Sequence, residues 1–171
     1  MLPTATDGFA GLRVLVTGGT IDKTYSPVEG TLTFSRTNVL ALLHQARVAL
    51  PDAKIQTVLL KDSLEMTDAD RDCIRAAAAA AAEPRLLITH GTDTMVLTAT
   101  HLARASLGKT IVLTGAMVPY AFGNSDSLFN FGTAFAAVQL LPAGVYIAMN
   151  GRVFPWDHVR KNRELGVFEA V

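Results

Sequence analysis

Apolar runs that stop abruptly in threonine and glycine are the dominant pattern of the chain. They lie at residues 14–21, 86–93 and 111–116. A short apolar run bounded by turn residues is typical of a strand buried in the core of a sheet. Because the carboxyl ends of parallel strands meet at one edge of a sheet, we expect the threonines and glycines of these runs to gather there.

Between these runs, apolar positions recur at helical spacing. One helix is predicted over residues 39–46, and Thr67 and Asp70 have the spacing of a capping box ahead of the alanine run at 76–82. The pattern predicts further helices over 92–107 and 126–141, and further strands over 54–60, 85–89, 110–114 and 144–149.

Alternation of strand and helix predicts a right-handed doubly wound α/β fold, with a mostly parallel sheet and helices on both faces, of the flavodoxin or Rossmann kind. We expect residues 1–171 to form a single domain, with residues 1–11 as a disordered or extended lead-in. Residues 22–27 and Gly30 form a polar stretch with turn residues, and residues 31–34 then alternate in polarity, which favours a short hairpin or flap that could act as a lid.

Composition narrows the class of ligand. Fifteen basic and fifteen acidic residues cancel, and basic residues form no stripe with interleaved aromatics, which argues against nucleic acid and anionic membrane as partners. The single Cys73 has neither a disulfide partner nor the spacing of a metal site. The chain shows no secretory pattern at its start and no run long enough to span a bilayer, so we expect a cytoplasmic protein. A small neutral or zwitterionic ligand fits this composition.

Hydroxyl and carboxylate groups converge at the expected strand ends. Thr20, Ser63, Thr92 and Asp93 lie there, among glycine amides that suit an oxyanion. A threonine attacks a carbonyl only when a base takes its proton, and Asp93 beside Lys161 could serve if the fold returns Lys161 to this edge. The set suggests acyl transfer without metal or other cofactor.

Plainer interpretations remain open for the same residues. Threonine and serine at strand ends are more often helix caps than nucleophiles, and His90 is more often a hydrogen-bonded structural histidine. A nucleotide-binding oxidoreductase also begins with a strand and a glycine turn. However, the third glycine of that fingerprint is missing from residues 20–24.

Two segments in order resemble the signatures of the bacterial-type L-asparaginase family. They are Thr17-Gly18-Gly19-Thr20-Ile21 and His90-Gly91-Thr92-Asp93-Thr94-Met95. Residues 62–66, 114–117 and 149–150 are also similar to family segments, so the resemblance covers nearly the whole chain from Arg13.

The resemblance implies hydrolysis of L-asparagine to L-aspartate and ammonia through a threonine nucleophile, with minor glutaminase activity as a further possibility. It assigns catalytic roles to Thr20, Thr92, Asp93, Lys161 and Tyr25, and substrate binding to Gly19, Asp62, Ser63, Gly91, Asp93 and Ala116.

Two departures from the family pattern bear on substrate binding. Leu64 stands where the family usually has glutamine. The family's C-terminal domain, which supplies a glutamate to a neighbouring subunit, has no counterpart here, so the chain resembles short single-domain members. We expect a homo-oligomer, a dimer or tetramer. The alternative is an amino-acid-binding or regulatory module that keeps the pocket without efficient turnover.

Overall fold

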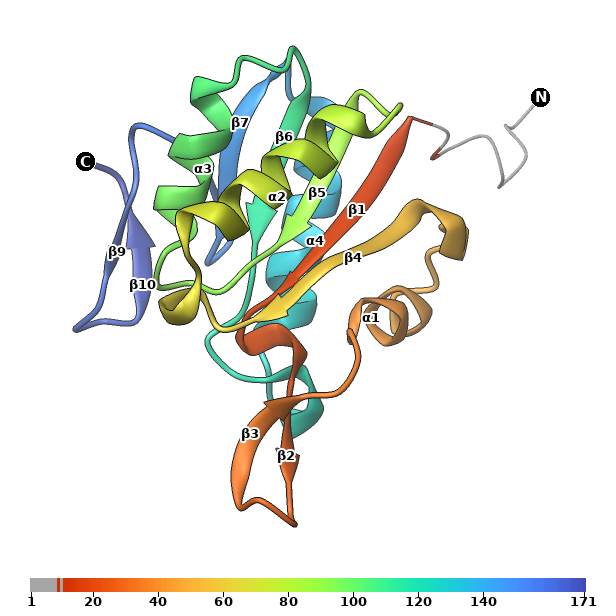
Figure 1. The fold of residues 1–171 in the computed structure, drawn as a ribbon, viewed down its shortest axis with the longest axis vertical. Helices are drawn as coiled ribbons and strands as arrows, with labels where there is room; N and C mark the ends of the chain where they lie inside the picture. The colour runs from red at the N-terminus through yellow and green to blue at the C-terminus, as the bar shows by residue number, and fades with distance from the viewer. Residues whose placement is uncertain (1–8, 10) are drawn as a thin grey trace.

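The computed structural model describes residue 9 and residues 11–171. A six-stranded sheet forms its centre, in the order β4-β1-β5-β6-β7-β8, and β8 alone runs antiparallel to its neighbour (Figure 1). The strands are β1 (Leu12–Gly18), β4 (Ile55–Lys61), β5 (Arg85–Thr89), β6 (Thr110–Thr114), β7 (Gly144–Met149) and β8 (Arg152–Pro155). The prediction of a doubly wound, mostly parallel sheet is therefore confirmed. The lead-in expected at residues 1–11 falls almost entirely outside the described residues.

Helices cover both faces of the sheet. One face carries α2 (Asp68–Ala80) and α3 (Met95–Arg104), and the other carries α1 (Val39–Gln45) and α4 (Ser127–Leu140) (Figure 1). The capping box of Thr67 and Asp70 opens α2 as expected. Two separate apolar clusters, one on each face, hold the layers together.

Buried strands explain how one sheet supplies two cores. In β1, Val14 and Val16 face the cluster under α1 and α4, while Leu15 between them faces the cluster under α2 and α3. All three side chains are fully buried. Successive side chains of a strand point to opposite faces, so a continuous apolar run serves both cores at once.

Short antiparallel hairpins flank the carboxyl edge of the parallel strands. The first, β2 (Lys23–Ser26) with β3 (Thr31–Phe34), projects from the body of the molecule, and it is the hairpin that the sequence predicts (Figure 1). The second, β9 (Arg160–Asn162) with β10 (Val167–Glu169), has no counterpart among the expected elements. Each hairpin brings a lysine to this edge: Lys23 pairs with Asp62 after β4, and Lys161 pairs with Asp93 after β5.

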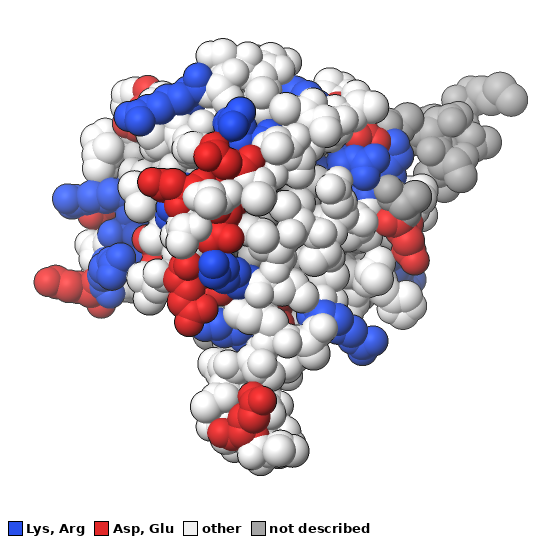
Figure 2. Space-filling model, in the orientation of Figure 1, with Lys and Arg blue, Asp and Glu red and all other residues white. Residues whose placement is uncertain are grey.

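Short 3-10 turns complete the connections between strands and helices. The turns are η1 (Thr20–Asp22), η2 (Asp52–Lys54), η3 (Ser63–Glu65) and η4 (Tyr120–Phe122). On the face shown in Figure 2, acidic side chains gather left of the centre with basic side chains around them, while the formal net charge of the whole chain is zero. No helix among the described residues is both long enough and apolar enough to span a bilayer.

Candidate active site

Glycines let the loops at the strand ends come into backbone contact. A Cβ atom added at Gly19 would lie 2.3 Å from the amide nitrogen of Gly91, and one added at Gly91 would lie 2.5 Å from Cβ of Ser63. No side chain fits in either position. The loops that follow β1, β4 and β5 therefore meet at one point, and Thr20 and Thr92 directly follow the two glycines.

The most complete constellation at this point joins Lys161 to Thr92 and Asp93. The Lys161 ammonium, from β9, donates to Thr92 Oγ1 at 2.8 Å and to Asp93 Oδ1 at 2.9 Å. The side chain of Lys161 is 14% exposed, and Thr92 is buried. Asp93 is 29% exposed, and its Oδ2 accepts no hydrogen bond within the described part of the chain. Arg163 lies 3.9 Å from Asp93 Oδ1 and adds a second positive charge.

A chain of asparagines helps to place the hairpin that carries Lys161. Phe168 lies directly opposite Lys161, and its amide donates to Asn150 Oδ1 at 2.8 Å. The amide of Asn150 donates to Asn130 Oδ1 at 3.0 Å, and the buried Asn130 donates to the carbonyl of Gly115 at 3.1 Å. We did not predict this positioning role from the sequence, although a polar Asn130 within an apolar helix was an available signal.

Thr20 begins η1 and is more accessible than Thr92. It is partly exposed, and its hydroxyl has no hydrogen-bond partner among the residues that the structure describes. Thr92 is 5% exposed and its hydroxyl accepts from Lys161. A substrate approaching this edge would therefore meet the Thr20 hydroxyl more readily, while Thr92 is the hydroxyl coupled to a lysine.

The helix after β5 begins later than predicted. The sequence predicts a helix from Thr92, whereas α3 begins at Met95. The reason is tertiary: Asp93 is held by Lys161, and the Thr94 hydroxyl donates to the carbonyl of Ser63 at 2.8 Å. These contacts keep Thr92 and Asp93 in the turn ahead of the helix, where their side chains reach the carboxyl edge.

Ser63 and Asp62 follow β4, and the side chains of both are engaged by contacts within the protein. Ser63 is only 1% exposed, packed against Gly91. Asp62 accepts from the amide of Leu64 at 2.9 Å and forms an ion pair with Lys23. Partial burial acts to raise the pKa of Asp62, but the bonds from Lys23 and Leu64 outweigh it and lower the pKa. Contact of Ser63 or Asp62 with a substrate stays a prediction.

Tyr25 lies on the projecting β2–β3 hairpin (Figure 1). It is 58% exposed and lies opposite Leu32 in the β2–β3 pair. The ion pair of Lys23 with Asp62 ties the base of this hairpin to η3. The hairpin is thus fixed at its base, and its catalytic assistance stays a prediction.

The loop after β6 closes another side of the site. Ala116 is fully buried in the core cluster under α1 and α4, so the structure leaves none of its surface open to a ligand. Asp126 holds this loop by accepting from the amides of Met117 and Val118 at 3.0 and 3.1 Å. The Met117 sulfur then lies 3.7 Å from Thr92 Oγ1. A contact between Ala116 and the substrate amide stays a prediction.

His90 shows the structural character that its position favours. It is fully buried, and burial lowers its pKa to about 4 despite the bond to the Gly91 carbonyl, so the ring is neutral near pH 7. Its Nδ1 lies 2.8 Å from the Gly91 carbonyl, and its Nε2 lies 2.8 Å from the Thr98 hydroxyl. The neutral ring therefore bridges α3 to the Gly91 turn.

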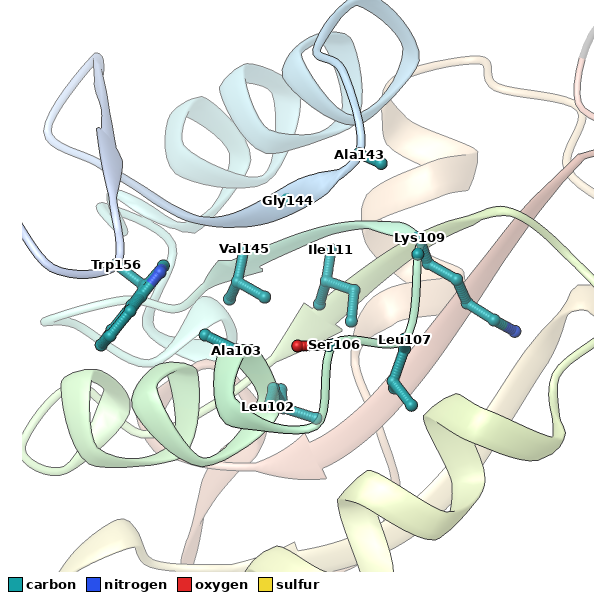
Figure 3. A pocket seen from close by; sticks show the side chains of 11 residues that line it. Leu102, Ala103, Ser106, Leu107, Lys109, Ile111, Ala143, Gly144, Val145 and Trp156 are labelled. Atoms are coloured by element: carbon teal, nitrogen blue, oxygen red, sulfur yellow. The ribbon is translucent and has the colours of Figure 1, made fainter.

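Of two hollows on the surface, one lies apart from the predicted site residues and the other includes Lys161. Figure 3 shows a pocket of about 290 Å³ at the amino ends of β6 and β7, and none of the predicted site residues lines it. A shallower hollow of about 400 Å³ includes Lys161 and Arg163. The described residues include no group of three or more His, Cys, Asp or Glu side chains suited to hold a metal ion.

Comparison with known proteins gives one consistent family. The model of the family "Asparaginase, N-terminal" matches residues 11–168. The L-asparaginase of Thermococcus kodakarensis is 32% identical over 163 residues, which cover 91% of this chain and 49% of that protein. L-asparaginase 1 of Escherichia coli is 32% identical over 162 residues, which cover 88% of this chain and 47% of that protein. The chain spans about half the length of the curated relatives it matches.

Solved structures agree with this match. The thermostable L-asparaginase of Thermococcus kodakarensis superposes with a TM-score of 0.75 at 30% identity, over 94% of this chain and 51% of that one. L-asparaginase I of Vibrio cholerae superposes with a TM-score of 0.77 at 27% identity, over 93% and 50%. A probable cytoplasmic L-asparaginase of Campylobacter jejuni gives 0.76 at 26% identity, over 93% and 52%.

Proposed function

The chain belongs to the asparaginase family through its N-terminal type of domain, and from this membership we propose that it hydrolyses L-asparagine to L-aspartate and ammonia. The single observation that carries the proposal is the contact of Lys161 with both Thr92 and Asp93, which joins residues 69 and 68 positions apart at the end of β5. A solvated lysine would have no reason to be 14% exposed beside a buried hydroxyl.

The proposed reaction is an acyl transfer in two halves. A threonine hydroxyl, from Thr20 as the more accessible candidate, attacks the side-chain carbonyl of asparagine and gives up its proton. The C–N bond of the tetrahedral intermediate then breaks, and ammonia leaves with a proton. Water attacks the resulting ester, releases L-aspartate and restores the hydroxyl.

Lys161 is the proposed base within this scheme. In its neutral amine form it takes the proton of the Thr92 hydroxyl at 2.8 Å, and Asp93 at 2.9 Å stabilises the ammonium that results. When Thr20 attacks, its hydroxyl gives its proton to the Thr92 oxygen while the proton of the Thr92 hydroxyl passes to Lys161. Backbone amides of the turns after Gly19 and Gly91 are the proposed donors to the oxyanion.

Substrate binding is proposed at the outward side of the same turns. Asp93 Oδ2 suits the α-ammonium of asparagine, because Lys161 occupies only Oδ1. Ser63 is proposed for the α-carboxylate, which requires Gly91 to move slightly since Ser63 is almost fully buried. Leu64, which is exposed, offers no polar group there, so weak binding is expected.

An ammonia assay on a small panel of amides tests the function. We expect the 171-residue chain to release ammonia from L-asparagine, with a slower rate from L-glutamine, and equally well in the presence of a chelator. Binding of asparagine without any ammonia over hours would contradict turnover and favour the amino-acid-binding module instead.

Two further features belong to the same proposal. We infer a homo-oligomer, because the family that this chain resembles completes its substrate site with a glutamate from a neighbouring subunit. Light scattering that finds only fully active monomer would contradict it. A cytoplasmic location is supported by the likeness to the probable cytoplasmic L-asparaginase of Campylobacter jejuni, and fractionation of cells that express the protein tests it.

A further inference from the structure

A buried carboxylate that the proposed mechanism does not use closes the turn that carries Thr20. Asp22 is the last residue of η1 and is fully buried. Its Oδ1 accepts from the amide of Asn38 at 2.7 Å and from the hydroxyl of Thr37 at 3.0 Å. Its Oδ2 is buried as well and has no hydrogen-bond partner in the described part of the chain.

Asn38 makes a second hydrogen bond to η1, through its side chain. The side-chain amide of Asn38 donates to the carbonyl of Ile21 at 3.0 Å. Within the turn, the amide of Asp22 donates to the carbonyl of Gly19 at 3.0 Å, and the amide of Lys23 donates to the carbonyl of Thr20. Along the chain, Thr20 therefore lies between the Gly19 contact on one side and the Asp22 anchor on the other.

Burial of Asp22 is unfavourable for its charged form. Desolvation raises its pKa to about 6, and the bonds from Asn38 and Thr37 only partly oppose that shift. The charged and titratable side chains near it are engaged elsewhere: Lys23 pairs with Asp62, and the Tyr120 hydroxyl of η4 donates to Gln45 at 2.9 Å. His44 of α1 is exposed. Asp22 therefore forms no ion pair among the described residues. Its structural role rests on the hydrogen bonds that it accepts from the segment before α1.

We propose that Asp22 is a positioning residue for Thr20, acting through η1 to hold the Thr20 hydroxyl in register with Thr92. The same anchor fixes the base of the β2–β3 hairpin, which begins at the next residue. The inference rests on the proposed function for its catalytic consequence. A displacement of the hydroxyl by about 1 Å is expected to lower turnover by about 100-fold.

Two variants of Asp22 separate positioning from general stability. Asp22→Ala removes the acceptor and should lower kcat about 100-fold while KM changes less than about threefold, since substrate contacts remain. Asp22→Asn keeps an acceptor at Oδ1 and should restore kcat to within about threefold of wild type. The matched control is Glu83→Gln, which alters another buried carboxylate at the opposite edge of the sheet and should leave kcat unchanged.

The pH profile gives a readout that a merely structural role would not move. In wild type, protonation of Asp22 as the pH falls through about 6 weakens Oδ1 as an acceptor, so kcat should fall a few-fold there. Asp22→Asn carries no charge at any pH, so its kcat should lack this step. A step that persists in Asp22→Asn would overturn the assignment.

Hydrogen exchange tests the anchor independently of catalysis. The amides of Asp22 and Lys23 are bonded within η1, and Asp22→Ala should speed their exchange while the core strand β5 keeps its protection. A wild-type protein that releases no ammonia would defeat the proposed function, but the exchange result would still stand. Unchanged exchange and unchanged kcat in Asp22→Ala would overturn the positioning role, as would an equal loss of kcat in Glu83→Gln.

A milder variant covers the case in which Asp22→Ala fails to fold. Asn38→Ala removes the side-chain bond to Ile21 but leaves the backbone amide that donates to Asp22. Loss of one such bond should lower kcat about tenfold and speed exchange at Asp22 and Lys23. Wild-type kcat and wild-type exchange in Asn38→Ala would contradict the proposal.

Discussion

An ion pair lies at each edge of the parallel sheet, and the two pairs differ in whether a carboxylate oxygen is left without a hydrogen-bond partner. At the amino edge, Glu83 is 4% exposed and pairs with Arg13 at 2.7 Å and with Lys54. The bond from Arg13 is the largest of the effects that lower the pKa of Glu83 to about 2. At the carboxyl edge, Asp93 is 29% exposed, and Lys161 divides its donors between Asp93 and the Thr92 hydroxyl.

The difference separates a structural pair from a reactive one. Glu83 engages both of its oxygens with cations, so the pair is saturated and contributes to the stability of the fold. Lys161 engages a hydroxyl, and Asp93 keeps one oxygen without a partner among the described residues. Paired charges therefore stabilise the fold at one edge and remain available for chemistry at the other. Four substitutions test this contrast, and the one with the largest expected effect comes first.

Lys161→Met gives the largest expected change. It removes the base and the Thr92 contact, so turnover should fall about 1,000-fold. Stability should change by less than about 1 kcal/mol, because the pair is partly exposed. Steady-state ammonia release and thermal unfolding measure the two effects. Turnover close to wild type would remove Lys161 from the mechanism.

Gly91→Ala tests the glycine contact that assembles the carboxyl edge. The new methyl group would lie 2.5 Å from Cβ and Oγ of Ser63, so it should destabilise the fold by about 3 kcal/mol and lower turnover. Gly132→Ala in α4 is the matched control, since a Cβ there meets no atom within 4 Å. That change should stabilise the fold by about 0.5 kcal/mol. Urea unfolding compares them, and equal stability of both variants would refute the close contact.

Glu83→Gln tests the amino edge and should lower the stability of the fold without lowering turnover. The pKa of Glu83 is depressed from 4.5 to about 2 in the folded state. A depressed pKa contributes stability above the unfolded value that is lost as the pH falls from about 4.5 toward 2. We expect a loss of about 2 kcal/mol at pH 7 and a shallower acid slope of the unfolding free energy. A loss of turnover instead would erase the contrast between the edges.

Tyr25→Phe should have the smallest effect of the four. The side chain is 58% exposed and lies on the projecting hairpin, so removal of its hydroxyl should leave stability within about 0.5 kcal/mol. If the hairpin assists the nucleophile, turnover should fall about tenfold with little change in KM. Unchanged turnover would assign Tyr25 to packing alone.

The fold could be predicted where burial decides the pattern. A continuous apolar run such as residues 86–89 predicts a strand that is buried on both faces of a sheet. The capping box of Thr67 and Asp70 marks the start of α2 from local chemistry alone. The β9–β10 hairpin could not be predicted, because each of its strands is only three residues long and the hairpin depends on a distant contact. That contact is the bond from the Phe168 amide to Asn150.

Prediction of the site was limited in the same way. Spacing alone placed Thr92 and Asp93 near a strand end. Nothing local indicates that Lys161 returns to meet them, so from the residues its role was conditional on the fold, and the family resemblance then assigned it. The late start of α3 depends on tertiary bonds of Asp93 and Thr94, which helix propensity does not contain. Asp22 gives no sequence signal, because an aspartate in a polar turn is ordinarily solvated.

Conversion of L-asparagine labelled with nitrogen-15 at its amide distinguishes the reactive edge from the structural one in a single experiment. Wild type, Lys161→Met and Glu83→Gln are followed by NMR at matched concentration, with chelator present. Wild type and Glu83→Gln should release labelled ammonium at the same rate, with one L-aspartate formed for each, and Lys161→Met should release almost none. Failure of wild type to release ammonium, or equal rates in all three proteins, would contradict the proposed reaction.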